Sequence, residues 1–85
     1  MSIYTRFGSK VEILSDMGKQ KPPYFKFPAT LLKIKFLDDG KIEHYWADFL
    51  KADEAWPEIE KAIKAVPKET FKDKKAMKEA FAEAE

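Results

Sequence analysis

The stretch ATLLKIKFLDDGKIEHYWADFL, residues 29–50, combines strand-like alternation, a turn signal and a dense set of apolar residues, which together predict a β-hairpin. We expect Asp38-Asp39 to form a type I turn, followed by Gly40 in the left-handed conformation of a G1 bulge. Leu37 then pairs with Lys41. The other opposed pairs are Leu32 with Trp46, Ile34 with His44 and Phe36 with Ile42 on an apolar face, and Lys35 with Glu43 and Lys33 with Tyr45 on a polar face.

A two-residue turn of type I′ at Asp39-Gly40 is the alternative. It would oppose Phe36 with Glu43 and Ile34 with Tyr45. Such pairs mix apolar and polar residues on both faces of the hairpin, so the bulged register is preferred.

The composition limits the size and the chemistry of the protein. A chain of 85 residues forms one domain and buries only roughly 60 to 65% of the surface that its unfolded form exposes, which argues against a large pocket. The absence of cysteine excludes disulfides, thiolate chemistry and cysteine-ligated zinc. There is no signal-peptide pattern and no stretch near the ~18 apolar residues of a membrane span, so we expect a cytoplasmic protein that does not enter a membrane.

The whole chain predicts an α+β domain: a small twisted antiparallel sheet of three or four strands within about residues 3–47, followed by two C-terminal helices. Residues 4–15 alternate as a half-buried strand, residues 16–23 read as a loop, and residues 24–28 suit an edge strand or extended segment. Residues 47–51 predict a short helical turn that buries Phe49 and Leu50.

The two helices are expected at about residues 54–66 and 70–84. Trp56, Ile59, Ile63 and Val66 form one apolar stripe along the first helix. Thr70, with Asp73 three residues on, resembles a capping box for the second helix. The large apolar residues of that helix are Phe71, Met77 and Phe81, so we expect it to be weakly anchored.

The expected core combines these periodicities. It consists of Val11, Ile13, Leu32, Ile34, Phe36, Ile42, Trp46, Phe49, Leu50, Ile59 and Ile63.

Charge is unevenly distributed along the chain. Residues 1–37 contain seven basic and two acidic residues, a net charge of +5, whereas residues 38–85 contain nine basic and thirteen acidic residues, a net charge of −4. This asymmetry suggests a basic β surface apposed to an acidic helical one, although a solvated surface of mixed sign explains it equally well.

The strongest functional signal is a set of lysines interleaved with aromatic residues. Lysines attract phosphates and rings stack on bases, which is how small β modules hold single-stranded DNA or RNA. The alternative is that Phe25 and Phe27 belong to the core, with the lysines only keeping a sheet edge hydrated. The candidate nucleic-acid-binding residues are Lys19, Lys21, Tyr24, Lys26, Lys33, Lys35 and Tyr45.

Catalysis has little support in the sequence. His44 is the only histidine, and the preferred register places it on the apolar face, where a structural role is favoured over that of a general base. Asp48 could orient it, but no nucleophile motif, phosphate loop or metal-ligand spacing accompanies the pair. Asp38-Asp39 fits a turn better than a metal site. We expect no enzyme activity, metal site or cofactor.

Protein binding is the competing class of function. Exposed aromatic residues on an extended Pro-Pro-Tyr segment could anchor an interface, as in an adaptor or an inhibitor that acts by occlusion. Trp46 and Trp56 could contribute to such an interface, but the simplest expectation is that they pack against each other and fasten the first helix to the sheet. The sequence does not indicate an oligomeric state.

Residues 8–13, GSKVEI, followed by Gly18-Lys19, resemble the opening of KOW-type SH3-like small barrels. The hairpin that follows resembles the central meander of such barrels, and the likeness covers residues 7–50. The sequence differs in having Pro22-Pro23 where such barrels have glycine and valine, and helices in place of a closing last strand. The resemblance implies a non-catalytic module that binds nucleic acid or protein, without assigning individual residues.

Overall fold

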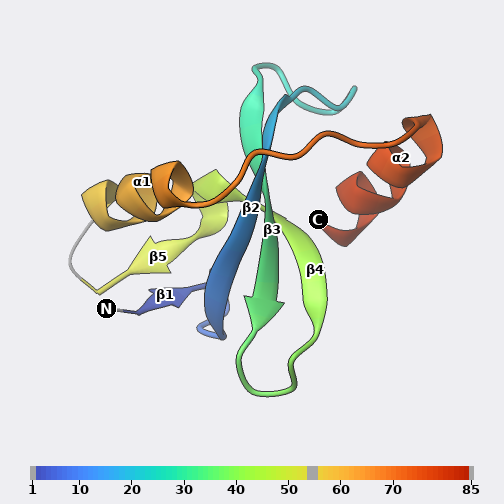
Figure 1. Cartoon of the computed structure of the whole chain (residues 1–85). Helices are drawn as coiled ribbons and strands as arrows, with labels where there is room; N and C mark the ends of the chain where they lie inside the picture. The colour runs from blue at the N-terminus through green and yellow to red at the C-terminus, as the bar shows by residue number, and fades with distance from the viewer. Residues whose placement is uncertain (1, 54–55, 85) are drawn as a thin grey trace.

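The computed structural model describes residues 2–53 and 56–84 and shows an antiparallel five-stranded sheet followed by two helices. The strands lie side by side in the order β4-β3-β2-β1-β5 (Figure 1). The α+β class expected from the sequence is confirmed. The elements are β1 (Ile3–Tyr4), β2 (Lys10–Gln20), β3 (Ala29–Phe36), β4 (Ile42–Trp46), the 3₁₀ turn η1 (Ala47–Phe49), β5 (Lys51–Ala52), α1 (Trp56–Ala65) and α2 (Lys74–Glu83).

The sheet is larger than the sequence predicts. The strand expected over residues 4–15 is divided between β1 and β2, and β2 continues to Gln20 through the predicted loop. After η1, the short strand β5 returns to pair with β1, so a final strand is present where helices were expected to replace it. The predicted helical turn after β4 is confirmed as η1, and Leu50 is buried.

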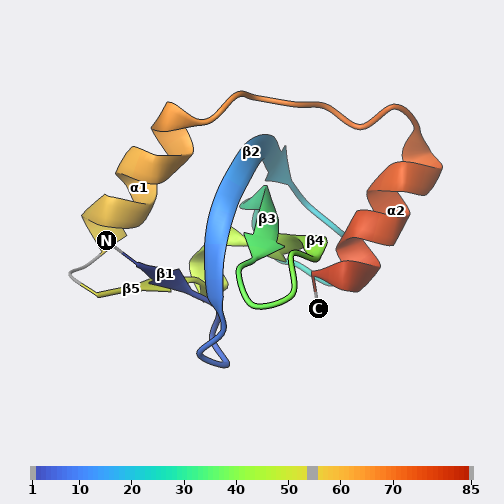
Figure 2. The ribbon, with the colours of Figure 1, turned by 60° about the horizontal axis from the view of Figure 1, so that its bottom comes forward.

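The sheet is covered on both faces. Figure 2 shows α1 and α2 on opposite sides of the sheet, joined by residues 66–73, which we call the strap. The α1 face carries the larger cluster, which includes Ile13, Ile34 and Ile59. The α2 face carries Met17, Ala29, Leu31, Trp46, Ala80 and Ala84. Because successive residues of a strand point to opposite faces, neighbours such as Leu31 and Leu32 are both buried, each in a different cluster.

Shifts in the pairing of β2 with β3 allow β2 to contribute buried residues to both clusters. Val11 and Ile13 face α1, whereas Met17, which would share their face in a regular strand, packs toward α2. The pairing with β3 shifts between Ile13 and Ser15, and a bulge of this kind reverses the faces of the residues that follow it.

The hairpin register differs from both registers considered from the sequence. Leu32 pairs with Tyr45, Leu31 with Trp46 and Lys33 with His44, one residue away from the expected pairs. The loop is closed by hydrogen bonds from the Phe36 N–H to the Lys41 carbonyl and from the Gly40 N–H to the Phe36 carbonyl, both at 2.8 Å. The loop therefore consists of residues 37–40, one residue more than the expected three-residue bulged turn. A shift of one residue moves a whole strand to the other face.

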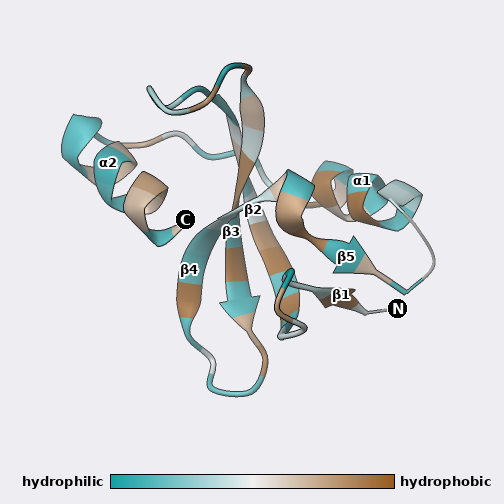
Figure 3. Ribbon diagram, turned by 180° about the vertical axis from the view of Figure 1, so that it is seen from behind, coloured by the Kyte–Doolittle hydropathy of each residue, from teal (hydrophilic) through white to brown (hydrophobic). Residues whose placement is uncertain are grey.

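This shift overturns several expected positions. Tyr45 is buried on the α1 face instead of lying on a polar face, and Trp46 faces α2 instead of sharing a face with Leu32. Ile42 is 54% exposed, so its place in the expected core is wrong. Figure 3 shows hydrophobic and hydrophilic residues alternating along the later part of β3, whereas β4 does not alternate in this way. Val11, Ile13, Leu32, Ile34, Trp46, Leu50 and Ile59 are buried as expected, with Phe36, Phe49 and Ile63 packed partly buried against them.

The ends of both helices lie close to their expected limits, but α2 begins at Lys74, four residues after the expected start at residue 70. Residues 54–55, where the first helix was expected to start, lie outside the described part of the chain. Asp73, not Thr70, caps α2, because its side chain accepts a hydrogen bond from the Ala76 backbone N–H (2.8 Å). The alanines Ala80 and Ala84 are fully buried, so their small side chains let α2 lie close to the sheet.

Gly40 closes the hairpin loop with a φ of +75°, which confirms the expected left-handed conformation. We expect Gly40→Val to lower the free energy of unfolding by about 1 kcal/mol or more, since β-branched residues resist this conformation. A Cβ at this position would meet only Lys35 Cε, at 4.0 Å, so space is not limiting. Gly40→Asn should cost less in a urea titration, because asparagine tolerates positive φ; equal losses would contradict the backbone explanation.

Candidate nucleic-acid interface

Residues 21–28 form a loop between β2 and β3, which we call the aromatic loop. It is a series of turns and bends and not the edge strand or extended segment expected at residues 24–28. Pro22 is buried, and its carbonyl accepts a hydrogen bond from the Phe25 N–H (3.0 Å). The Phe25 ring packs on Trp46, with ring centroids 4.6 Å apart, and Tyr24 meets Phe25 edge to face at 5.1 Å. These contacts anchor the loop to the α2-face core.

The rest of the aromatic loop displays rings and cations. The side chain of Phe27 is 77% exposed and that of Tyr24 is 53% exposed. Lys19 at the end of β2 and Lys21 and Lys26 in the loop are also exposed. Within residues 2–53 and 56–84, none of the three lysines takes part in an ion pair. Four of the seven candidate residues (Lys19, Lys21, Tyr24 and Lys26) therefore lie at one end of the sheet.

A hollow of about 360 Å³ separates the aromatic loop from α2. It is lined by Pro23, Tyr24, Lys78, Phe81 and Ala82, and the Tyr24 hydroxyl donates a hydrogen bond to the Phe81 carbonyl (3.4 Å). Sequence reasoning missed the contribution of α2, which it treated as part of an acidic surface. The helical spacing of Lys74, Lys78 and Ala82, four residues apart, was the available signal that they share one face.

The remaining candidates lie elsewhere. Lys33 and Lys35 are on the α2 face of β3, and the Lys33 Nζ is 3.1 Å from Glu69 Oε2, so its charge is paired. Tyr45, 8% exposed, is buried on the opposite face of the sheet. The single continuous patch suggested by the sequence therefore does not form.

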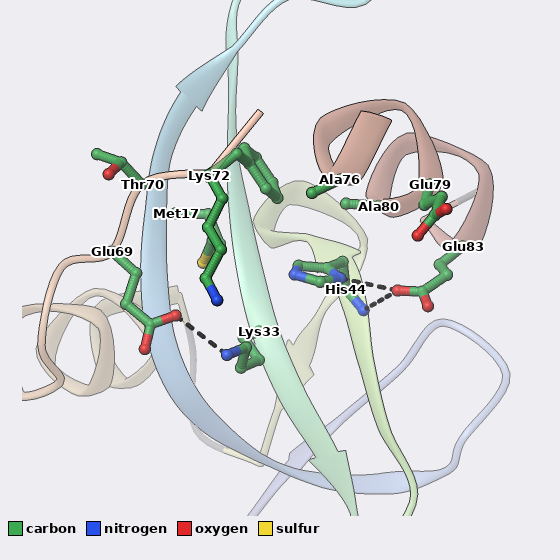
Figure 4. Close-up of a pocket in the computed structure, with 11 residues that line it drawn as sticks. Met17, Lys33, His44, Glu69, Thr70, Lys72, Ala76, Glu79, Ala80 and Glu83 are labelled. Carbon is green, nitrogen blue, oxygen red and sulfur yellow. Dashed lines mark hydrogen bonds and ion pairs between the residues drawn. The ribbon is translucent and has the colours of Figure 1, made fainter. Parts of the chain in front are cut away.

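A second cavity, of about 290 Å³, lies between the sheet, the strap and α2 (Figure 4). His44 Nδ1 is 2.7 Å from Glu83 Oε1, and the His44 backbone N–H donates to the same oxygen at 3.1 Å. Glu83, not Asp48, therefore orients the histidine. Phe71 of the strap packs against the His44 ring, with centroids 5.7 Å apart. His44 thus lies on the α2 face and not beside Ile34, and its contacts fasten α2 and the strap to β4.

The strap is attached to β2 and β3 in two ways. The Asp16 backbone N–H donates a hydrogen bond to the Pro67 carbonyl, and the Glu69 backbone N–H donates one to the Asp16 carbonyl, both at 2.9 Å. These bonds lie on the part of β2 that does not pair with β1. The hydrogen bond from Lys33 lowers the pKa of Glu69, and burial opposes this effect only in part. Because the folded-state pKa is lowered, this contact stabilises the fold above the ordinary pKa of glutamate and is lost as the pH falls through the lowered value.

No protein-family model, curated protein or solved structure matches this sequence. In the described part of the chain, no group of three or more histidine, aspartate or glutamate side chains could hold a metal ion. Over the same residues, no helix combines the length and the apolar character needed to cross a membrane. The fold defines a small α+β domain, and the geometry of the aromatic loop is the basis for assigning it a function.

Proposed function

We propose that this protein is a non-catalytic binding module that holds single-stranded nucleic acid on the aromatic loop. The observation that carries this proposal is the exposure of Phe27 (77%) and Tyr24 (53%) beside lysines that make no ion pair among residues 2–53 and 56–84. Exposed rings provide stacking surfaces for bases, and unpaired lysines attract the phosphates between them.

The proposed interface is narrower than the one suggested by the sequence. It contains Lys19, Lys21, Tyr24 and Lys26, gains Phe27, and leaves out Lys33, Lys35 and the buried Tyr45. The resemblance to KOW-type SH3-like barrels is part of the proposal. It is supported by the placement of β5 beside β1 after a 3₁₀ turn, an arrangement that brings the first and last strands together.

Binding is tested by fluorescence anisotropy with labelled single-stranded DNA, single-stranded RNA and duplex DNA. For three to five phosphate contacts, raising the salt from about 50 to 200 mM should weaken single-strand binding roughly 20- to 130-fold. The double charge reversal Lys21→Glu/Lys26→Glu should weaken binding relative to the wild-type protein. It should also reduce the salt dependence by the amount expected for the loss of about two phosphate contacts.

Two matched controls locate the interface. Lys61→Glu/Lys64→Glu makes the same change of charge on the exposed surface of α1 and should leave affinity within about threefold. Phe27→Ala should weaken binding, whereas Phe7→Ala, which removes a ring that is 80% exposed in the turn between β1 and β2, should not. Equal effects of loop and control variants would contradict the assignment. No binding of any nucleic acid at low salt and micromolar protein would favour the protein-binding alternative, with Phe27 and Tyr24 as anchors.

A further inference from the structure

We infer that the hollow between the aromatic loop and α2 is a slot for one unpaired base, so that the module prefers single strands to duplexes. This inference rests on the proposed function. It adds a binding position built from two segments far apart in the sequence, residues 23–24 and residues 78–82.

The walls of the slot are held in place before any ligand arrives. On one side, Tyr24 is positioned by its edge-to-face contact with Phe25 and by the hydrogen bond to the Phe81 carbonyl. On the other side, Phe81 stacks on the buried Trp46, with centroids 5.8 Å apart and ring planes 24° apart. Binding sites whose walls are already ordered lose less conformational entropy when they bind.

The lining of the slot suits the flat apolar face of a base. Pro23, Tyr24, Phe81 and Ala82 provide carbon-rich walls, and Lys78 is the one charged residue among those that line the hollow. A base stacked inside a duplex would have to leave the stack to enter, which costs free energy, whereas a base of a flexible single strand is free to do so.

The charges around the slot favour an anionic chain. Lys21 and Lys26 flank Pro23 and Tyr24 in the aromatic loop, and Lys74 lies on the same face of α2 as Lys78. The acidic residues Glu79 and Glu83 of this helix line the other cavity, on the far side of α2. Phosphates on either side of an inserted base would therefore meet lysines.

The test compares two single strands of equal charge. One is an oligonucleotide of about 12 residues, and the other is an abasic chain of the same length with the same number of phosphates. The base in the slot should tighten wild-type binding of the base-containing strand roughly 5- to 150-fold over the abasic chain, the range expected for one stacked base, and stacking on Phe27 adds to this preference. The protein should also bind this strand more tightly than a duplex. Ala82→Met, which fills the slot from an exposed helix position, should remove the part of this preference that the slot contributes, roughly 5- to 150-fold, and leave affinity for the abasic chain unchanged.

The controls separate this inference from the proposed function. Ala65→Met makes the same substitution at an exposed position of α1 and should change neither affinity. If Ala82→Met has no effect while Lys21→Glu/Lys26→Glu weakens binding, the slot is wrong and the proposed function stands. Equal wild-type affinity for the two strands overturns the slot without any variant. A polyglutamate peptide that competes as well as the base-containing strand also overturns it, and no binding to either strand removes both proposals.

Discussion

Trp46→Ala should lower the free energy of unfolding by about 3 to 5 kcal/mol, the range typical of removing a large buried aromatic side chain. Trp46 is 1% exposed and lies between Phe25 of the aromatic loop and Phe81 of α2. Its loss leaves a cavity where these two segments meet the sheet. A urea titration followed by circular dichroism measures the effect, and amide exchange should show α2 opening more often than in the wild type.

Trp56 provides the matched control, because the same substitution removes a side chain that is 41% exposed. Its indole N–H donates a hydrogen bond to Glu60 (2.8 Å) on α1, a contact at the protein surface. Trp56→Ala should therefore cost below about 1 kcal/mol. If the two tryptophans packed against each other, as the sequence suggested, both variants would lose similar amounts and the double variant would be clearly non-additive.

Ile34→Ala should lower the free energy of unfolding by about 2 to 5 kcal/mol, since the side chain is completely buried on the α1 face. Ile34 pairs with Ile13 across β2 and β3, at the centre of the sheet. For a domain of this size, whose whole stability is roughly 4 to 13 kcal/mol, such a loss is a large fraction of the total.

Ile42→Ala tests the register of the hairpin with the same chemical change. Ile42 pairs with Lys35 and is 54% exposed, so its truncation should cost below about 1 kcal/mol. In the register expected from the sequence, Ile42 would face Phe36 in the core and the two isoleucine variants would lose comparable amounts. A large loss for Ile42→Ala would therefore contradict the observed pairing.

Part of the candidate interface could be predicted from the sequence and part could not. Lys19, Lys21, Tyr24 and Lys26 were identified because cations and rings follow one another closely within a few residues. Local sequence could not show that Lys33 meets Glu69, because these residues are 36 positions apart and come together only when the strap crosses the sheet. Phe27 and Phe25 are two residues apart, yet Phe25 packs on Trp46 and Phe27 is exposed.

The sequence by itself determined the elements that local chemistry specifies. The periodicity of residues 29–50 produced the hairpin, Gly40 its left-handed loop residue, and the apolar spacing around Ile59 the first helix. Tertiary structure alone decided the register, the faces and the neighbours. Because the sheet is buried on both faces, apolar residues at two adjacent positions can both be buried, one on each face. The alternation of apolar and polar residues along a strand therefore cannot select one register. Trp46 packs in one cluster with Ala80 and Ala84 of α2, which requires the register that turns Trp46 toward α2, and the same packing places Lys78 and Phe81 opposite Tyr24.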